Sequence, residues 1–389
     1  MAIKCRQAGI RQLILPQENV AEAKVVDTVR VVAADSLQTA IAVLAGQPRE
    51  ATEIASVKPG GSAGATALPG DDFRDVQGQR AAKRALEIAA AGGHNLLMTG
   101  SPGAGKTMLA RRISTILPPM TTDEALEVSK IYSVAGLLGP MTGLIEQRPF
   151  RAPHHTVSAA AMAGGGRIPR PGEVTLAHHG VLFLDELTEF PRQVLEVLRQ
   201  PIEDGQVTVA RVNSTYTYPS RFMLVLAMNP CPCGYLGDPL RECSCTPAEI
   251  KRYLRRISGP LMDRIDLHIN VPRLHYEEMA GEQQAESSCA IAERVAAART
   301  RQAERLGTAG VFCNAQMNHR QLKQHCNLNR EAQELLRQAF EKMKLNARSY
   351  DRIIKVAQTI ADLAGQQKIA YEHIAEAVQL RIAVEENEN

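Results

Sequence analysis

Apolar residues in this chain form two kinds of pattern, short continuous runs and longer stretches of helical periodicity. Continuous apolar runs occupy residues 95–99, 180–184 and 222–227, and helical sequence separates each run from the next. Runs of this length between helices predict buried strands of a parallel sheet. We therefore expect an α/β domain over residues 71–272 and a helical domain over residues 273–389, where Ala, Leu, Glu, Arg and Gln dominate.

The first 46 residues differ from the rest and predict a small αβ piece. Residues 12–16 and 29–33 contain strand-like apolar runs, and Ser36 can cap a following helix. At most two strands and one helix fit into residues 1–46, which is too little for an independent core. Residues 47–70 are rich in Pro, Gly, Ala and Ser and predict a linker.

The composition is that of an ordinary globular protein and excludes few partners. Lys and Arg number 45 against 42 Asp and Glu, so the formal net charge of +3 does not by itself predict binding to nucleic acid or membrane. Aromatic residues make up 4% of the chain and Trp is absent, which disfavours base-stacking platforms and favours Ala-rich helices. The chain has neither an apolar run of 18 residues nor an apolar secretory signal, so we expect a cytoplasmic protein.

A glycine-rich loop with the pattern G-x-x-x-x-G-K-T follows the first apolar run and precedes a helical stretch. Such a loop directs successive backbone amides at phosphate oxygens, and the helix N-terminus adds its dipole. Lys106 is expected to reach the β- and γ-phosphates of ATP, and the Thr107 hydroxyl to bind Mg²⁺. The expected nucleotide-binding residues are Gly100, Ser101, Pro102, Gly103, Ala104, Gly105, Lys106, Thr107 and Met108.

The second and third apolar runs also end in polar residues. Asp185 and Glu186 follow the second run, where Asp185 would hold the Mg²⁺ shell and Glu186 would polarise the attacking water. Asn229 follows the third run and could orient that water, or it could simply form a turn before Pro230. With the phosphate loop, these residues predict ATP hydrolysis.

Three arginines are candidates for contact with nucleotide. Arg264 could act as an arginine finger on the γ-phosphate of a neighbouring subunit, because a fixed guanidinium stabilises charge on the transferring phosphoryl group. The alternative is a surface ion pair with Asp263 or Asp266. Arg348 begins a late helix and could sense nucleotide, and Arg352, one turn away, competes for that role.

Four of the eight cysteines lie within fifteen positions, at Cys231, Cys233, Cys243 and Cys245. Four thiolates from a short loop can hold one tetrahedral Zn²⁺, and with all four positions filled the ion would be structural. Two disulfides or four free thiols are the alternatives. In a reducing compartment the cluster favours metal over disulfides.

Two pairs of adjacent histidines, His154-His155 and His178-His179, could suggest another metal site. Adjacent residues on a strand point in opposite directions, and the sequence offers no carboxylates at ligand spacing. We therefore expect hydrogen-bonded structural roles for these histidines.

The order of these motifs resembles that of the AAA+ ATPases, and within them the magnesium-chelatase-like ComM/YifB family. The stretches that carry the resemblance are residues 148–155, 164–166, 171–186, 229–234 and 257–266. The resemblance covers residues 71–385. It implies an AAA+ P-loop core with a helix-2 insert between the two Walker motifs, a hairpin before Asn229 and an α-helical lid. It further implies that Arg264 is the finger and Arg348 the second sensor.

The family resemblance also implies a function. It implies a homo-hexameric ring that uses ATP and Mg²⁺ to drive branch migration of DNA, independently of sequence, during integration of transforming DNA. Two rival functions remain open: a motor subunit for metal insertion of the magnesium-chelatase type, and a protein-remodelling ATPase.

Residues 1–46 are similar to the last part of a Lon-type protease domain, which members of the family carry complete. The region that holds the Ser and Lys of such a protease would precede Met1, and Lys4 lies too late in the motif to replace it. We therefore interpret the chain as N-terminally truncated and expect no proteolysis.

Two loops could grip DNA. Residues 205–221 alternate as in a hairpin and contain no acidic residue, and Arg211 occupies the position of a pore-facing basic residue in related helicases. Residues 164–172 form a second acid-free loop with Arg167 and Arg170. Cations on such loops can follow the phosphate backbone without reading sequence, and a ring multiplies their charge. The alternative is that Arg211 is an ordinary solvated hairpin residue.

Overall fold

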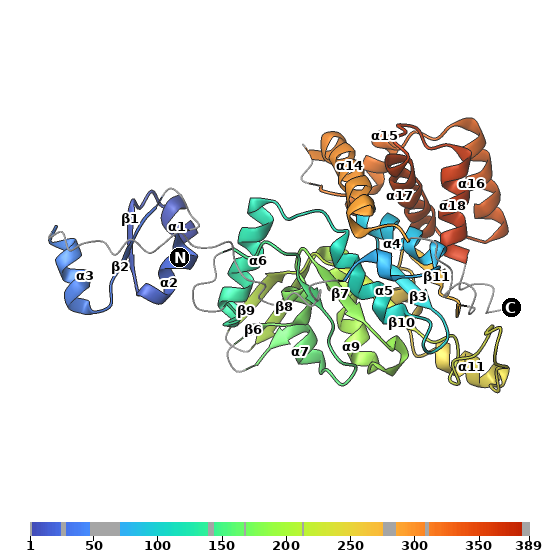
Figure 1. The fold of residues 1–389 in the computed structure, drawn as a ribbon, viewed down its shortest axis with the longest axis horizontal. Coiled ribbons are helices and arrows are strands. Elements are labelled where there is room, and N and C mark those ends of the chain that lie inside the picture. Colours follow the sequence, from blue (N-terminus) through green and yellow to red (C-terminus); the bar gives the residue numbers. More distant parts are fainter. Residues whose placement is uncertain are drawn as a thin grey trace. The chain divides into compact units, whose positions relative to one another are not determined.

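A computed structural model describes residues 2–24, 29–46, 71–138, 144–166, 169–211, 214–274, 285–307 and 311–382 (Figure 1). The chain divides into two compact units, one of Met1–Ala65 with Pro119–Arg148 and one of Thr66–Pro118 with Pro149–Asn389. The expected linker, residues 47–70, lies outside the described residues. Every helix in the described ranges is too short or too polar to cross a lipid bilayer.

The N-terminal segment of the first unit contains the two expected strands, β1 (Gln12–Leu15) and β2 (Arg30–Ala33), paired in parallel. It contains three helices instead of the one expected: α1 (Ala2–Gln7), α2 (Gln17–Ala23) and α3 (Leu37–Leu44). The prediction missed α1 and α2 because helices of six and seven residues are too short to show clear periodicity. The expected cap of α3 is confirmed, since Ser36 Oγ accepts the N–H of Thr39 at 3.2 Å.

The second segment of the first unit contains α6 (Thr122–Ala135). A reciprocal capping box begins this helix: the Thr121 side chain accepts the N–H of Glu124, and the Glu124 carboxylate accepts the N–H of Thr121. Gly136, in the left-handed conformation, ends it.

The second unit is built on a five-stranded sheet in which every pairing is parallel. The strand order is β11 (Leu267–Asn270), β3 (Leu96–Thr99), β10 (Met223–Met228), β7 (Val181–Leu184) and β4 (Phe150–Arg151). Every residue of β3, β7 and β10 is buried, which explains why these strands read as continuous apolar runs. The predicted parallel α/β sheet is confirmed.

The late part of the chain forms a helical layer over α4 (Arg80–Gly92), coloured orange to red in Figure 1. Its helices are α14 (Ser288–Leu306), α15 (His319–His325), α16 (Arg330–Lys342), α17 (Ala347–Leu363) and α18 (Tyr371–Ile382). Both α14 and α17 pack on α4, while α18 packs against α17 and reaches β11. One hydrophobic core joins this layer to one face of the sheet. The expected helical lid is thus present, and its boundary at residue 273 stays a prediction.

Two small antiparallel hairpins interrupt the α/β order of the second unit. The first lies between β4 and β7 and consists of α7 (Ala159–Ala163), β5 (Gly164–Gly165), β6 (Arg170–Pro171) and α8 (Glu173–Leu176). The second pairs β8 (Gln206–Arg211) with β9 (Ser214–Pro219) directly before β10. These elements match the expected helix-2 insert and the expected hairpin before Asn229.

The remaining helices are short and connect the elements above. They are η1 (Phe73–Asp75), α5 (Lys106–Arg112), η2 (Ile113–Thr115), η3 (Leu187–Glu189), α9 (Arg192–Val197), α10 (Arg199–Asp204), α11 (Pro247–Leu254), α12 (Gly259–Met262) and η5 (Asn314–Gln316).

Candidate functional site

The predicted nucleotide residues come together at the carboxyl ends of three neighbouring strands. The glycine-rich loop follows β3, Asp185 and Glu186 follow β7, and Asn229 follows β10, which lies between those two strands. Parallel strands present their carboxyl ends at the same edge, where open α/β sheets bind ligands.

The glycines of the phosphate loop are required by its backbone. Gly103 and Gly105 have φ values of +78° and +91°, a region that other residues rarely adopt. At Gly100 a Cβ would lie 2.2 Å from the carbonyl oxygen of Val271, so the close approach of the segment after β11 excludes any side chain. Gly105 directly precedes α5, which starts at Lys106. The loop therefore delivers the N-terminus of a helix to the phosphate position.

Lys106 is folded back onto the loop that it would serve. Its Nζ donates to the carbonyl oxygens of Gly100 at 2.6 Å and Ser101 at 3.0 Å, and to Oδ1 of Asn229 at 3.2 Å. Burial lowers the pKa of this ammonium, while the carboxylates of Asp185 and Glu186 act in the opposite direction. Lys106 therefore links the phosphate loop to the residue at the end of β10.

Thr107 and Asp185, the two expected Mg²⁺ ligands, are in direct contact. The Thr107 hydroxyl donates to Oδ2 of Asp185, and Oδ1 of Asp185 accepts the backbone N–H of Glu186 at 2.9 Å. Hydroxyl and carboxylate oxygens at a phosphate loop suit Mg²⁺, which prefers oxygen ligands and keeps several waters. These donors fit the metal that the motif implies.

Glu186 lies at the end of β7 in an unusual backbone conformation. Its φ is +52°, in the left-handed region that non-glycine residues seldom adopt, and its side chain is 60% exposed. A non-glycine residue in this region costs free energy, and such residues cluster at functional sites. The turn points the carboxylate into solvent, where it can meet a water molecule.

His155 contacts Glu186, which the sequence did not predict. Its Nδ1 lies 3.3 Å from Oε2 of Glu186, and its ring lies 4.0 Å from that of His154. Adjacent histidines on a strand would point in opposite directions, but His154 and His155 both follow β4 in a segment without strand structure. In the other pair, Nδ1 of His178 accepts the N–H of Arg221 at 2.9 Å, and the structural role of these histidines stays a prediction.

Arg264 lies at the amino ends of the parallel strands, whereas the phosphate loop lies at their carboxyl ends. Its carbonyl oxygen accepts a hydrogen bond from Nδ2 of Asn95 at 3.0 Å, and Asn95 directly precedes β3. The phosphate loop begins at Gly100, after β3 ends. Five residues of strand span about 16 Å. The Arg264 side chain therefore cannot reach the nucleotide site of its own subunit.

The guanidinium of Arg264 pairs with a residue that the sequence did not suggest. It donates to the carbonyl oxygen of Pro260 at 2.6 Å and forms an ion pair with Glu203, at the end of α10. Arg264 thus forms an ion pair, as the alternative interpretation of the sequence predicted, but its partner is Glu203 and not the suggested Asp263 or Asp266. Sixty-one residues separate Glu203 from Arg264, so no local pattern could reveal the contact.

The structure gives Arg348 and Arg352 different surroundings. The side chain of Arg348 is 61% exposed and approaches the same Glu203 carboxylate at 3.8 Å. Arg352 donates to the carbonyl oxygen of Arg264 at 3.1 Å and forms an ion pair with Asp266. Arg352 is thus held by partners in the core, whereas the side chain of Arg348 is mostly exposed to solvent.

Asp266 is the buried centre that joins the lid to the sheet. Its Oδ2 accepts the N–H of Asn95 at 3.0 Å and lies 3.5 Å from Nδ1 of His94, while Oδ1 binds Arg352 of α17. Burial by itself raises the pKa of Asp266. The Arg352 guanidinium and His94 outweigh this effect and hold the pKa well below its usual range. The carboxylate is therefore charged and paired.

The two candidate DNA loops are in contact with each other. The Tyr218 hydroxyl of β9 donates to the carbonyl oxygen of Pro169 at 3.2 Å. The helices α7 and α8, which flank the first loop, share one hydrophobic core with the second loop through Met162, Val174 and Val207. Arg211 pairs in register with Ser214 at the end of the β8–β9 hairpin, and its side chain lies outside the described residues. Arg170 on β6 is exposed, and Arg167 lies outside the described residues.

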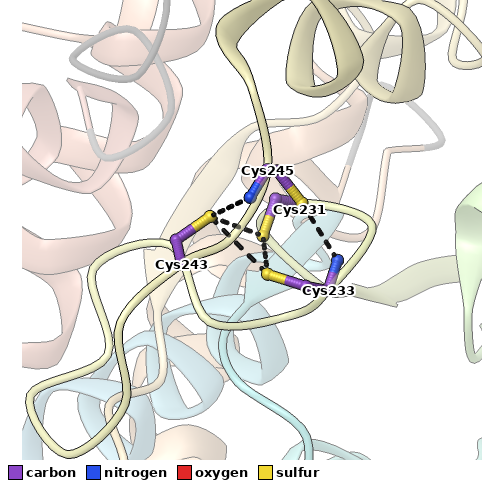
Figure 2. A group of neighbouring side chains, drawn as sticks. All are labelled: Cys231, Cys233, Cys243 and Cys245. Carbon is purple, nitrogen blue, oxygen red and sulfur yellow. Dashed lines mark hydrogen bonds between the residues drawn. The ribbon is translucent and has the colours of Figure 1, made fainter.

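The four cysteines of the predicted metal site converge, as Figure 2 shows. The Sγ atom of Cys231 lies 3.4 Å from that of Cys233 and 3.6 Å from that of Cys243, and the latter two are 3.5 Å apart. The Sγ of Cys245 accepts the N–H of Cys233 at 3.3 Å and completes the group. A disulfide would require about 2.05 Å, whereas four Zn–S bonds of about 2.3 Å in a tetrahedron place sulfurs about 3.8 Å apart. The donor set therefore fits zinc.

Comparison with known proteins identifies the family. The family model "Magnesium chelatase, subunit ChlI" matches residues 72–279, and "Magnesium chelatase, subunit ChlI C-terminal" matches residues 285–381. The first match spans the phosphate loop, Asp185, Glu186 and the cysteine cluster, and the second spans the helical layer.

Individual relatives extend the similarity to the N-terminal segment. Competence protein ComM of Haemophilus influenzae is 44% identical over 387 residues, 98% of this chain and 74% of that protein. Protein YifB of Escherichia coli is 42% identical over 377 residues, 95% of this chain and 71% of that protein. The magnesium-chelatase 38 kDa subunit of Rhodobacter capsulatus is 27% identical over 197 residues, 46% of this chain and 55% of that subunit. The chain therefore belongs to the ComM/YifB family of magnesium-chelatase-like AAA+ P-loop NTPases.

Proposed function

We propose that this protein hydrolyses ATP and uses the energy to move DNA strands. The observation that carries ATP hydrolysis is the convergence of Lys106, Thr107, Asp185, Glu186 and Asn229 at one edge of the sheet. These residues supply a cation that binds the phosphates, two metal ligands, a general base and a polar amide, and phosphoryl transfer to water requires such groups.

Each residue has a defined task in this proposal. When ATP binds, the Lys106 ammonium leaves the carbonyl oxygens of the loop and binds the β- and γ-phosphates instead. Thr107 and Asp185 hold Mg²⁺, which neutralises charge on the phosphates when bound. Glu186 accepts a proton from the attacking water, and Asn229 orients that water. His155 holds the Glu186 carboxylate until nucleotide is present.

The positions of the arginines favour a ring in which neighbouring subunits share each site. Arg264 and Arg348 both contact Glu203, on the edge of the sheet away from the phosphate loop. In a head-to-tail assembly this edge faces the nucleotide of the next subunit, so both guanidinium groups act in trans. We propose a homo-hexamer with Arg264 as the finger and Arg348, in preference to Arg352, as the second sensor.

Three features support DNA as the partner. The insert and the β8–β9 hairpin touch through Tyr218, so Arg170 and Arg211 belong to neighbouring loops. Each loop is free of acidic residues, and six copies around a pore would concentrate positive charge. The relative from Haemophilus influenzae is named a competence protein, which agrees with a role in integrating transforming DNA. Branch migration in the cytoplasm is the activity that these features support best.

A branch-migration assay on a synthetic four-way junction, with and without ATP, tests this function. The wild-type protein should convert the junction into its duplex products by branch migration only when ATP is present. Arg211→Ala should retain substantial basal ATPase and lose both stimulation by DNA and migration, while Arg320→Ala, an exposed residue of α15, should behave as wild type. Normal migration by Arg211→Ala would remove the hairpin from this role. No migration by the wild type would contradict the DNA function.

A magnesium-chelatase motor subunit is the second candidate, favoured by the two family matches and the Rhodobacter capsulatus subunit. Such a subunit would need a metal-chelating partner to use its ATPase. DNA-stimulated ATPase in the absence of any partner would exclude this candidate, and ATPase indifferent to DNA would favour it.

A further inference from the structure

The cysteine cluster is continuous with the nucleotide site. Cys231 lies two residues after Asn229, which is itself bound to Lys106 at 3.2 Å. The chain then runs through residues 231–245, here called the cysteine loop, before α11 begins at Pro247. Neither helix nor strand occurs in this loop. Two backbone turns, in which the N–H of Gly234 donates to the carbonyl oxygen of Cys231 at 3.0 Å and the N–H of Asp238 to that of Tyr235 at 3.1 Å, fix its conformation together with side-chain contacts.

The cysteine loop packs directly on the phosphate loop. Gly234, at φ +87°, lies so close that a Cβ there would be 2.7 Å from Cδ of Pro102. The Asp238 side chain has no exposed surface, and its carboxylate lies beside the hydroxyl of Ser101. Arg273 approaches the same carboxylate at 3.9 Å and donates to the carbonyl oxygen of Pro102 at 3.2 Å. Ser101 and Pro102 of the phosphate loop are thus both in contact with the cysteine loop, and Arg273 joins the two loops.

Sulfur atoms organise the two ends of the cysteine loop. The N–H of Cys233 donates to Sγ of Cys245 at 3.3 Å, and the N–H of Cys245 donates to Sγ of Cys243 at 3.4 Å (Figure 2). The Cys231 side of the group is fully buried. Several thiolates at these separations repel one another strongly unless a cation lies between them. A bound Zn²⁺ removes the repulsion and fixes both ends of the loop.

We propose that a zinc ion held by Cys231, Cys233, Cys243 and Cys245 clamps the cysteine loop against the phosphate loop, and that zinc occupancy thereby sets the affinity for nucleotide. This inference rests on the proposed nucleotide site. Without the ion the loop is no longer held at both ends, so Gly234 and Asp238 contact the phosphate loop only part of the time. Apparent affinity then falls in proportion to the fraction of molecules with the contact formed.

Two variants separate the metal from the contact that it supports. Cys243→Ser removes one ligand. Asp238→Ala removes the carboxylate beside Ser101, together with the hydrogen bonds that its Oδ1 accepts from the N–H groups of Leu240 and Arg241 at 2.9 and 3.1 Å, and leaves all four thiols. Cys289→Ser is the matched control, because Cys289 is exposed on α14 and outside the cluster. For each full-length protein, zinc per chain is measured by elemental analysis and nucleotide affinity by titration with a fluorescent ADP analogue, which requires no hydrolysis.

We expect one zinc per chain in the wild type, Cys289→Ser and Asp238→Ala, and little in Cys243→Ser. The dissociation constant for the ADP analogue should rise about tenfold in Cys243→Ser and in Asp238→Ala, as for a contact formed in one molecule in ten. Circular dichroism verifies that each variant is folded. If Cys243→Ser does not fold, the affinity of Asp238→Ala alone tests the clamp.

The outcomes distinguish this inference from the proposed function. A zinc-free wild type, or unchanged affinity in Asp238→Ala, would overturn the clamp while the nucleotide site remains valid. Failure of the zinc-loaded wild type to bind the analogue would instead overturn the nucleotide site on which the clamp depends.

Discussion

Replacing Asp266 by asparagine should destabilise the protein by separating the lid from the sheet. The carboxylate is the buried partner of Arg352, and it also accepts the N–H of Asn95. Asparagine can keep one acceptor for Asn95 but leaves the guanidinium of Arg352 without its counter-ion.

The size of the effect follows from the burial of the two partners. Their side chains are 5% and 20% exposed for Asp266 and Arg352 respectively. Removing one member of a buried pair costs about 3–5 kcal/mol, because the other charge stays buried and unpaired. Since Arg352 keeps a fifth of its surface in water, we expect the free energy of unfolding to fall by about 3 kcal/mol, near the lower end of that range.

The effect should depend on acidity with a predictable sign. The folded pKa of Asp266 is depressed, so its contribution is fully present above the unfolded pKa of about 4 and is lost progressively as pH falls from there through the lower folded pKa. Urea unfolding at pH 7 and at pH 3.5 measures this, with Asp263→Asn as control because that residue has no ion-pair partner among the described residues. A loss below about 1 kcal/mol at pH 7 would refute the assignment of Asp266 as the link.

Three further predictions concern single residues of the second unit. Burial, reinforced by Arg381, lowers the pKa of His268 to about 3. Below pH ~6.5 the unfolded chain therefore binds a proton that the folded chain does not, and the free energy of unfolding decreases as the pH decreases. His268→Leu should remove up to about 1.4 kcal/mol per pH unit of this dependence between pH 6 and 4, as measured by urea unfolding. Asn346→Ala should cost about 1 kcal/mol in the same assay, because the Asn346 side chain caps α17 by accepting the N–H of Ser349 at 2.8 Å. Thr107→Ala should abolish the tightening of ATP binding by Mg²⁺ and leave metal-free binding nearly unchanged, and an undiminished Mg²⁺ effect would contradict its role as a ligand.

The sequence predicted the fold, and it predicted which residues would meet at the carboxyl ends of the strands, because those features are local. A buried parallel strand is a continuous apolar run, and the phosphate loop, Asp185 and Asn229 each follow such a run directly. The shared edge of parallel strands then brings them together without knowledge of side-chain contacts.

The residues that sequence reasoning missed are those whose partners are distant along the chain. Glu203 binds Arg264 across 61 positions, and Asp266 binds Arg352 across 86. His155 reaches Glu186 only because the segment after β4 is not a strand. Neither periodicity nor spacing encodes such pairs, since they depend on how finished elements pack.

The positions of the two halves of the site have a consequence for assembly. The phosphate loop lies at the carboxyl ends of the parallel strands and Arg264 at their amino ends, so in the proposed ring one subunit would offer different surfaces to its two neighbours. Such heterologous contacts form a closed ring if the rotation between subunits allows it. In the proposed ring, each site would take Lys106 from one chain and Arg264 from the next.

Mixing two inactive variants tests this arrangement. Lys106→Ala chains cannot bind ATP but still offer Arg264, whereas Arg264→Ala chains bind ATP but offer no finger. In an equal mixture, about a quarter of interfaces join an intact Lys106 to an intact Arg264. ATPase should therefore recover to about a quarter of the wild-type rate, although each variant alone is nearly inactive. If Arg264 acted within its own chain, no mixture could restore activity, and a rate no higher than that of the separate variants would show that the two surfaces do not meet.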